Sequence, residues 1–290
     1  MSGGEGPGPG VGRREFVRRL LGVVAAGGVA ARGMPAWTRL PRARRLGAIG
    51  LQLYSVRDRM DRDLEGTIAA VAAIGYREVE LAGLHGRTPR AMRALLDAHG
   101  LAAPSSHISL DDIRGDWAAT LDGAATLGQR FIVCPWIDER ERTADGYRRV
   151  AHEFNRAAEA ARAHGIQFAY HNHDFEFTPL GGALPYDLLL AECDRALVQM
   201  ELDIYWIVKG GQDPLAYFAR DPGRFPMIHA KDMARDGSMV DVGAGTIDWR
   251  AIFAHGREAG LVHTFVEHDD PPHPIADVRA SFDYLRRLEY

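Results

Sequence analysis

Cysteine is scarce in this chain, and its scarcity excludes several kinds of site. Only Cys134 and Cys193 occur among the 290 residues, far apart and each in an apolar stretch. No Cys-x-x-Cys pair or similar spacing is present, which argues against a cysteine-based metal site. We interpret both cysteines as core residues.

An excess of basic charge is also lacking. The chain carries 35 lysines and arginines against 39 aspartates and glutamates, which gives a formal net charge of −4 and a pI of about 6.3. This balance offers no basic face to a nucleic-acid backbone. We therefore expect a small-molecule ligand and no nucleic-acid partner.

A long hydrophobic run is the third absence. The apolar segment over residues 20–31 is shorter than the ~20 residues that a permanent membrane span requires. It follows the paired Arg13 and Arg14, and the whole block resembles a twin-arginine export signal, whose pathway carries proteins already folded. A basic amphipathic helix lying on the domain is the alternative interpretation.

These features divide the chain into residues 1–45 and residues 46–290. The first part opens with a Gly/Pro-rich stretch without helical or strand period, which is typical of disorder, and continues into the signal-like segment. Cleavage near Ala31 would release an exported, periplasmic protein. The second part is of the length at which a barrel forms one domain.

Beyond residue 45, short apolar or β-branched runs alternate with Ala/Leu/Arg-rich stretches of 3.6-residue periodicity. The predicted strands are residues 49–56, 78–83, 103–108, 130–136, 166–173, 197–206, 225–232 and 261–269. The predicted helices are residues 64–75, 89–100, 117–128, 146–165, 185–193, 214–220, 249–260 and 275–288. Eight strand–helix units in this order predict an α/β protein, a (β/α)8 or TIM barrel with parallel strands.

An open doubly wound sheet is the less favoured fold. Such a sheet needs a Gly-rich phosphate loop after its first strand, and residues 51–59 contain no glycine. The same absence argues against a nucleotide cofactor.

Polar side chains gather where the predicted strands end. In a barrel, the active site is built from these carboxyl ends and the loops that follow them. The residues concerned are Gln52, Tyr54, Glu80, His107, His171, His173, Asp203, His229, Lys231, Asp232, Glu267 and His268. Each alone has an ordinary explanation, such as a hydrogen-bonded core histidine or a carboxylate that caps a loop.

Four consecutive strands that each end in His, Asp or Glu are harder to explain without a bound cation. Carboxylates crowded at one barrel mouth repel and desolvate one another, and a divalent ion relieves this. A set of two imidazoles and two carboxylates suits Mn²⁺, Zn²⁺, Co²⁺ or Fe²⁺ better than Mg²⁺, which prefers oxygen ligands. The sequence therefore predicts one divalent metal ion.

Segments across residues 46–290 resemble the sugar phosphate isomerase/epimerase family, whose members have a xylose isomerase-like barrel. The matching segments are IGLQLYSVRD (49–58), GYREVEL (75–81), the strand that ends at His107, YHNHDFEF (170–177), MELDIYWIVKGGQDP (200–214), HAKDM (229–233), VGAGTIDW (242–249) and FVEHDD (265–270). The resemblance implies one divalent metal held by Glu, Asp, His and Glu from strands five to eight. Asp203, His229 and Glu267 fill the last three positions. The first position falls on His171, where most relatives have glutamate, and His173 is the alternative ligand.

The chemistry implied by the resemblance is that of a sugar isomerase or epimerase, with proton abstraction next to a carbonyl through a metal-stabilised enediolate. Glu267 is the leading base, His173 or Glu80 is the second group, and Lys231 neutralises charge on the enediolate. The residues expected to bind the substrate are Gln52, Glu80, His107, Trp206 and His268.

Other functions remain in competition with the isomerase. Because His171 replaces one of the two glutamates that flank the substrate in epimerases, a lyase that expels a β-substituent, for instance from a 3-keto-glycoside, is the alternative. A non-catalytic sugar-binding protein is less favoured, and the slightly acidic charge disfavours an endonuclease IV-type repair enzyme. The chain is compatible with a homo-oligomer.

Overall fold

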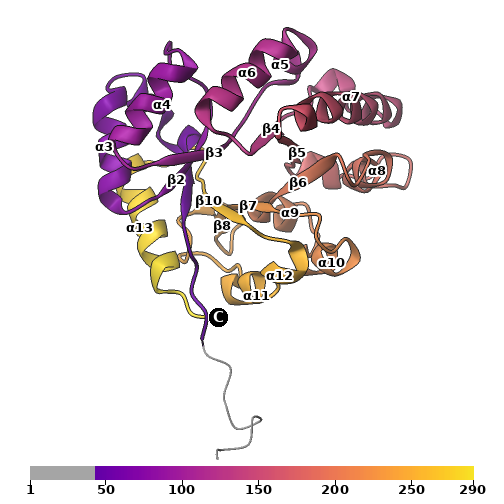
Figure 1. Cartoon of the computed structure of the whole chain (residues 1–290). Coiled ribbons are helices and arrows are strands. Elements are labelled where there is room, and N and C mark those ends of the chain that lie inside the picture. Colours follow the sequence, from indigo (N-terminus) through magenta and orange to yellow (C-terminus); the bar gives the residue numbers. More distant parts are fainter. Residues whose placement is uncertain (1–42) are drawn as a thin grey trace, which may run out of the picture. The chain divides into compact units, whose positions relative to one another are not determined.

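Eight parallel strands form a barrel surrounded by helices in the computed structural model, which describes residues 43–290 (Figure 1). The expected signal segment, with Arg13 and Arg14, lies outside the described residues. The barrel strands are β1 (Gly50–Gln52), β2 (Glu78–Leu81), β3 (Ala102–Ser106), β4 (Phe131–Cys134), β5 (Gln167–His171), β6 (Val198–Asp203), β7 (Met227–Ala230) and β10 (His263–Val266).

The strands follow one another in the order β3-β2-β1-β10-β7-β6-β5-β4. A parallel bridge between His107 and Val133 joins β3 to β4, with the N–H of Ile108 donating to the carbonyl of Val133 at 2.8 Å. This bridge closes the barrel. The predicted (β/α)8 fold is thereby confirmed.

Capping side chains start most of the outer helices, and glycines end several of them. The helices are α2 (Arg57–Met60), α3 (Leu64–Ile74), α4 (Pro89–Ala98), α5 (Leu110–Arg114), α6 (Trp117–Leu127), α7 (Ala144–Ala163), α8 (Pro185–Glu192), α9 (Ile204–Lys209), α10 (Pro214–Arg220), α11 (Trp249–Ala254), α12 (Gly256–Ala259) and α13 (Pro274–Arg287), with short 3-10 helices η2 (Leu53–Val56), η3 (Glu139–Glu141) and η4 (Phe175–Phe177). Asp63 and Asp116 accept hydrogen bonds from first-turn N–H groups, while Gly75 and Gly128 end α3 and α6 with φ of 124° and 77°. Within residues 43–290, none of the helices is both long and apolar enough to span a membrane.

All eight barrel strands are shorter than predicted, and two of them end where a polar side chain starts a helix. Gln52 accepts a hydrogen bond from the N–H of Tyr54, so that β1 passes directly into η2. Asp203 accepts one from the N–H of Trp206 at 2.8 Å, so that β6 passes into α9. The helix predicted over residues 249–260 is likewise two helices, α11 and α12, divided at His255.

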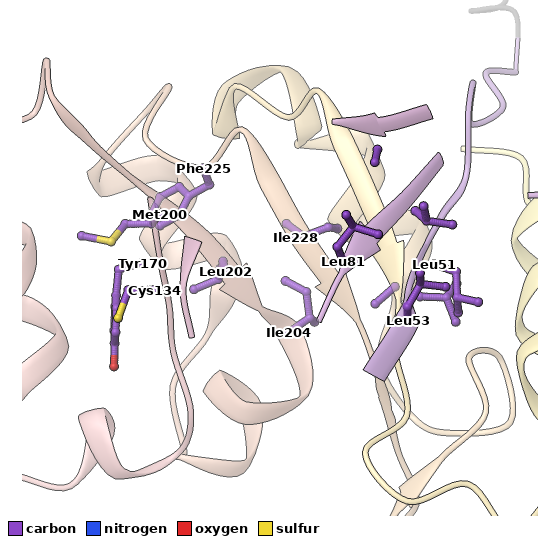
Figure 2. Close-up of a cluster of buried hydrophobic side chains, with 14 of the residues drawn as sticks. Leu51, Leu53, Leu81, Cys134, Tyr170, Met200, Leu202, Ile204, Phe225 and Ile228 are labelled. Atoms are coloured by element: carbon purple, nitrogen blue, oxygen red, sulfur yellow. The ribbon is translucent and has the colours of Figure 1, made fainter. Parts of the chain in front are cut away.

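Strand side chains alternate between two apolar layers, because successive residues of a strand face opposite sides. One layer packs against the helices, and Figure 2 shows part of it, including Leu51, Leu81, Met200 and Ile228. The other layer fills the barrel interior and consists of Val133, Ala169, Met227 and Phe265. Gly50 makes room for it, since a Cβ there would lie 2.4 Å from the Phe265 ring.

The apolar interior supports the polar barrel mouth. Two residues beyond Ala169, Met227 and Phe265 come His171, His229 and Glu267. Residues i and i+2 of a strand share a face, so each of these polar side chains stands directly above an apolar one. The barrel interior directly beneath the charged groups is therefore apolar.

Candidate metal centre and active-site cleft

Four side chains from adjacent strands converge at the carboxyl end of the barrel. His171 ends β5, Asp203 ends β6, His229 lies in β7 and Glu267 directly follows β10. One ligand atom from each lies within 4.8 Å of the others, and all four residues are buried. We call these four residues the metal quartet.

The donor atoms of the quartet fit a divalent ion. Asp203 Oδ2, His229 Nδ1 and Glu267 Oε2 are buried ligand atoms, and the ammonium group of Lys231 contacts both oxygens. The three atoms approach one another, with 2.6 Å from His229 Nδ1 to Glu267 Oε2 and 3.9 Å from His229 Nδ1 to Asp203 Oδ2. Two buried carboxylates and two imidazoles that converge in this way form a ligand set for a divalent cation, whose charge would add to that of Lys231. Two imidazoles and two carboxylates suit Mn²⁺, Zn²⁺, Co²⁺ or Fe²⁺.

Lys231 places an ammonium group against the same carboxylates. Its Nζ lies 3.0 Å from Asp203 Oδ2, 2.8 Å from Glu267 Oε2 and 2.6 Å from Asp269 Oδ1. Burial lowers the pKa of Lys231, but the three carboxylates outweigh it and hold this pKa well above its usual value. Burial raises the pKa of Glu267, but Lys231 and His229 hold it below its usual value. Lys231 is therefore charged and Glu267 ionised at neutral pH.

A buried hydrogen-bonded layer supports the quartet from β1, β2 and β3. His229 donates from Nε2 to Glu80 Oε2 at 2.7 Å. Gln52 Nε2 donates to the same oxygen at 2.8 Å, and Ser105 Oγ donates to Glu80 Oε1 at 2.5 Å. Because Nε2 of His229 carries the proton in this bond, Nδ1 is the nitrogen left for a metal.

Glu201 of β6 extends this layer and was not among the residues proposed from the sequence. It is fully buried, and its Oε2 lies 3.1 Å from His107 Nε2 and 3.2 Å from His229 Nε2. Burial lowers the pKa of His107, but Glu80 and Glu201 outweigh it and raise this pKa to about 9. In the sequence, the only indication that Glu201 belongs to the site is its position two residues before Asp203, on the same face of the strand.

The ligand atoms of His107, His171, Glu201 and His229 also lie within 4.8 Å of one another. This second group shares two imidazoles with the quartet. We interpret it as the supporting layer, because Nε2 of His229 is already bonded to Glu80.

A cleft of about 730 Å³ opens over the quartet. Its lining includes Tyr54, His107, Trp136, His171, His173, Phe175, Trp206, Lys231 and Glu267. The ring of His173 lies 5.0 Å from that of His171, between centroids, and is not part of the quartet. Burial and the charge of Lys231 lower the pKa of His173 to about 2, so its imidazole is neutral at physiological pH.

Comparison with known proteins identifies the family of this barrel. Residues 68–288 match the family described as xylose isomerase-like TIM barrel. The chain belongs to this family. Among its relatives, an inosose dehydratase of Lacticaseibacillus casei is 23% identical over 235 residues, which are 68% of this chain and 78% of the relative.

Solved structures of other barrels superpose on this xylose isomerase-like protein. A sugar phosphate isomerase/epimerase from Parabacteroides distasonis has a TM-score of 0.74 and 27% identity, covering 87% of this chain and 98% of that one. The IolI protein, whose structure contains a bound zinc atom, has a TM-score of 0.66 and 14% identity, covering 82% of this chain and 96% of that one. The IolI likeness shows the shared fold.

The residues predicted to bind substrate lie in different parts of this xylose isomerase-like barrel. His107 and Trp206 line the cleft. Gln52 and Glu80 are fully buried in the supporting layer, with their side chains bonded to each other. His268 is not among the residues that line the cleft, and its backbone N–H donates to the hydroxyl of Ser55, which follows β1.

Proposed function

We propose that this protein is a divalent-metal-dependent enzyme that removes the proton next to the carbonyl of a sugar-like ketone. The observation that carries the proposal is the convergence of the four buried ligand atoms of the quartet at the base of the cleft. When bound, the ion would supply a Lewis acid that polarises the substrate carbonyl. The donor set favours Mn²⁺, Zn²⁺, Co²⁺ or Fe²⁺ over Mg²⁺.

The protein groups around the cleft supply a base and a positive charge. Glu267 is held as a carboxylate by Lys231 and is the base that takes the proton from carbon. Lys231 also stabilises the negative charge that develops on the substrate oxygen. His173 lines the same cleft as a neutral imidazole and hydrogen-bonds the substrate.

Elimination is the outcome that this asymmetric set supports best. The electrons of the broken C–H bond form a C=C bond, the bond to the β-oxygen breaks, and the departing oxygen takes a proton from the solvent in the open cleft. One carboxylate base suffices for this course, whereas epimerisation uses two matched bases on opposite faces. Burial and the neighbouring His229 keep the pKa of His171 well below its usual value. His171 is therefore a neutral imidazole, and the quartet has no second glutamate that could act as a matched base. The name of the Lacticaseibacillus casei relative, a dehydratase, supports the same outcome.

Isomerisation or epimerisation is the second candidate. It is favoured by the likeness to the Parabacteroides distasonis structure described as a sugar phosphate isomerase/epimerase, which covers 87% of this chain. The first step is common to both outcomes, and only the fate of the deprotonated intermediate differs.

Proton exchange in D₂O tests the common step. The full chain, loaded in turn with Mn²⁺, Zn²⁺ and Co²⁺, is incubated with a set of keto-sugars, inososes and 3-keto-glycosides and followed by NMR. We expect deuterium at the α-carbon together with release of water or of an alcohol. Exchange with a rearranged ketose and no released group would favour the isomerase, and no exchange with any compound would contradict the proposal.

Matched variants assign the base in the same assay. Glu267→Gln removes the base and should abolish exchange. Glu258→Gln changes an exposed glutamate of α12 and should leave exchange unchanged.

A further inference from the structure

The outer cleft carries exposed aromatic rings that the chemistry at the quartet does not use. Within residues 43–290, three large hydrophobic side chains are exposed, namely Tyr54, Trp136 and Val262. Tyr54 and Trp136, at 42% and 45% exposure, both line the cleft. A large ring left in water forgoes the free energy that its burial would contribute, so two such rings at one cleft indicate a ligand that covers them.

An arginine holds each of these rings from one side. The guanidinium of Arg142 lies 4.5 Å from the centroid of Trp136 and 3.4 Å from that of Phe175, and its Nε donates to a backbone carbonyl at 2.9 Å. Arg57 lies 3.9 Å from the centroid of Tyr54. A ring braced in this way is oriented before a ligand arrives, which reduces the entropy lost on binding.

Trp136 is separated from the metal quartet by a single side chain. Its ring centroid lies 4.7 Å from that of His173, which in turn lies 5.0 Å from that of His171. A ligand ring on Trp136 would therefore be the immediate neighbour of a ring bound at the quartet. The cleft of about 730 Å³ is in the range that encloses drug-sized ligands, larger than one sugar ring requires.

We propose that Trp136 is the subsite for a second ring of the substrate, and that the substrate is accordingly a two-ring glycoside rather than a free monosaccharide. This inference rests on the proposed function, which places the reacting keto-sugar at the quartet. The second ring is then the group expelled in the elimination, and its departing oxygen takes a proton from the solvent in the open cleft, while His173 contacts Trp136 edge-on. The carboxylates of Asp138 and Asp174 line the same cleft and accept from hydroxyl groups of that ring.

Binding of paired, unreactive glycosides tests the subsite. For glucosides and galactosides, the Kd of the methyl glycoside, the phenyl glycoside and a disaccharide is measured by calorimetry with the metal-loaded full chain. These compounds have no ketone, so no turnover interferes. We expect the two-ring ligands to bind about 3- to 10-fold more tightly than the methyl glycosides, as expected for one aromatic stacking contact. Preference for the disaccharide or for the phenyl glycoside identifies the second ring as a sugar or an aryl group.

Variants separate stacking from general damage. Trp136→Ala should remove the advantage of the two-ring ligands and leave the methyl glycosides unchanged, whereas Trp136→Phe should keep part of the advantage. Val262→Ala, at an exposed residue outside the cleft lining, should change neither. Equal affinity of one-ring and two-ring ligands for the unaltered chain, or an equal loss for both in Trp136→Ala, would overturn the proposal.

The binding measurement and the exchange assay can fail separately, so the subsite and the proposed reaction are tested independently. If no ketone undergoes exchange but the preference that depends on Trp136 is present, the proposed function fails and the subsite stands. If free keto-sugars react and no ring preference exists, the subsite fails and the proposed function stands.

Discussion

His229 donates from Nε2 to the carboxylate of Glu80 across 2.7 Å of barrel interior, and this bond directs its Nδ1 to the metal quartet. Glu80 is therefore a positioning residue for a metal ligand. A carboxylate behind a ligating imidazole fixes the ring and raises its basicity, and loss of such a partner typically costs 10- to 100-fold in metal affinity.

Glu80→Gln should weaken divalent-metal binding by about 10- to 100-fold, measured by competition with a chelating dye. Glu78→Gln is the matched control, because Glu78 lies two residues earlier on the same strand and pairs with His263 at 2.8 Å, away from the quartet. Equal affinities of the Glu80 variant and the unaltered chain would contradict the positioning role.

Lys231→Met should destabilise the chain strongly in EDTA. Three carboxylates lose their cation in this variant, and breaking a buried ion pair typically lowers the free energy of unfolding by about 3–5 kcal/mol. Added Mn²⁺ should recover much of this loss, because the ion supplies the missing positive charge. Thermal denaturation with and without metal measures both effects. Lys209→Met, at the only other lysine of the chain and on an exposed position of α9, should change the melting temperature little.

Glu176→Gln should alter how stability depends on pH. Burial raises the pKa of Glu176 to about 7 from an ordinary value of 4.5, although the Tyr170 hydroxyl and the His173 N–H lower it. A carboxyl whose folded-state pKa is raised contributes stability that is full below about pH 4.5 and is lost as the pH rises through 7, by about 3 kcal/mol in all. The glutamine can still accept from the His173 N–H, so its advantage over glutamate should grow between pH 5 and pH 8. Urea denaturation of both proteins across this pH range measures the difference in unfolding free energy. Parallel curves of unfolding free energy against pH would refute the prediction.

His171→Glu should shift metal preference toward harder ions. A third carboxylate in place of an imidazole favours Mn²⁺ and Mg²⁺ relative to Zn²⁺ and Co²⁺. The ratio of dissociation constants for Mn²⁺ and Zn²⁺ is the measurement. His173→Gln is the control, because His173 lines the cleft outside the quartet. A larger change in the control than in His171→Glu would mean that His173 is the ligand.

The sequence was sufficient to predict the barrel because the signals for it are local. Helices that end at Gly75 and Gly128 and strands that run apolar can be recognised within ten or twelve residues. The strand ends at Gln52 and Asp203 were predicted wrongly, because apolar residues follow both and hide the hydrogen bond by which each side chain starts a helix.

The quartet could be proposed from the strand ends, but the layer that supports it could not. The role of a buried glutamate such as Glu201 can be recognised only from the side chains that contact it. Its partner His107 is 94 residues away in the chain, so the sequence does not show the contact. Ser105 carries no signal at all until β2 and β3 are placed side by side. Similarly, whether Gln52 and Glu80 face substrate or interior depends on side-chain partners from other strands.

Asp203 divides its two oxygens between different tasks. Oδ1 accepts from the N–H of Trp206 and begins α9, while Oδ2 faces Lys231 and the quartet. A metal ion held by Oδ2 would therefore bind the same carboxylate that begins α9, the helix whose first turn carries Trp206 into the cleft. One side chain thus connects the candidate metal centre to the wall of the substrate cleft.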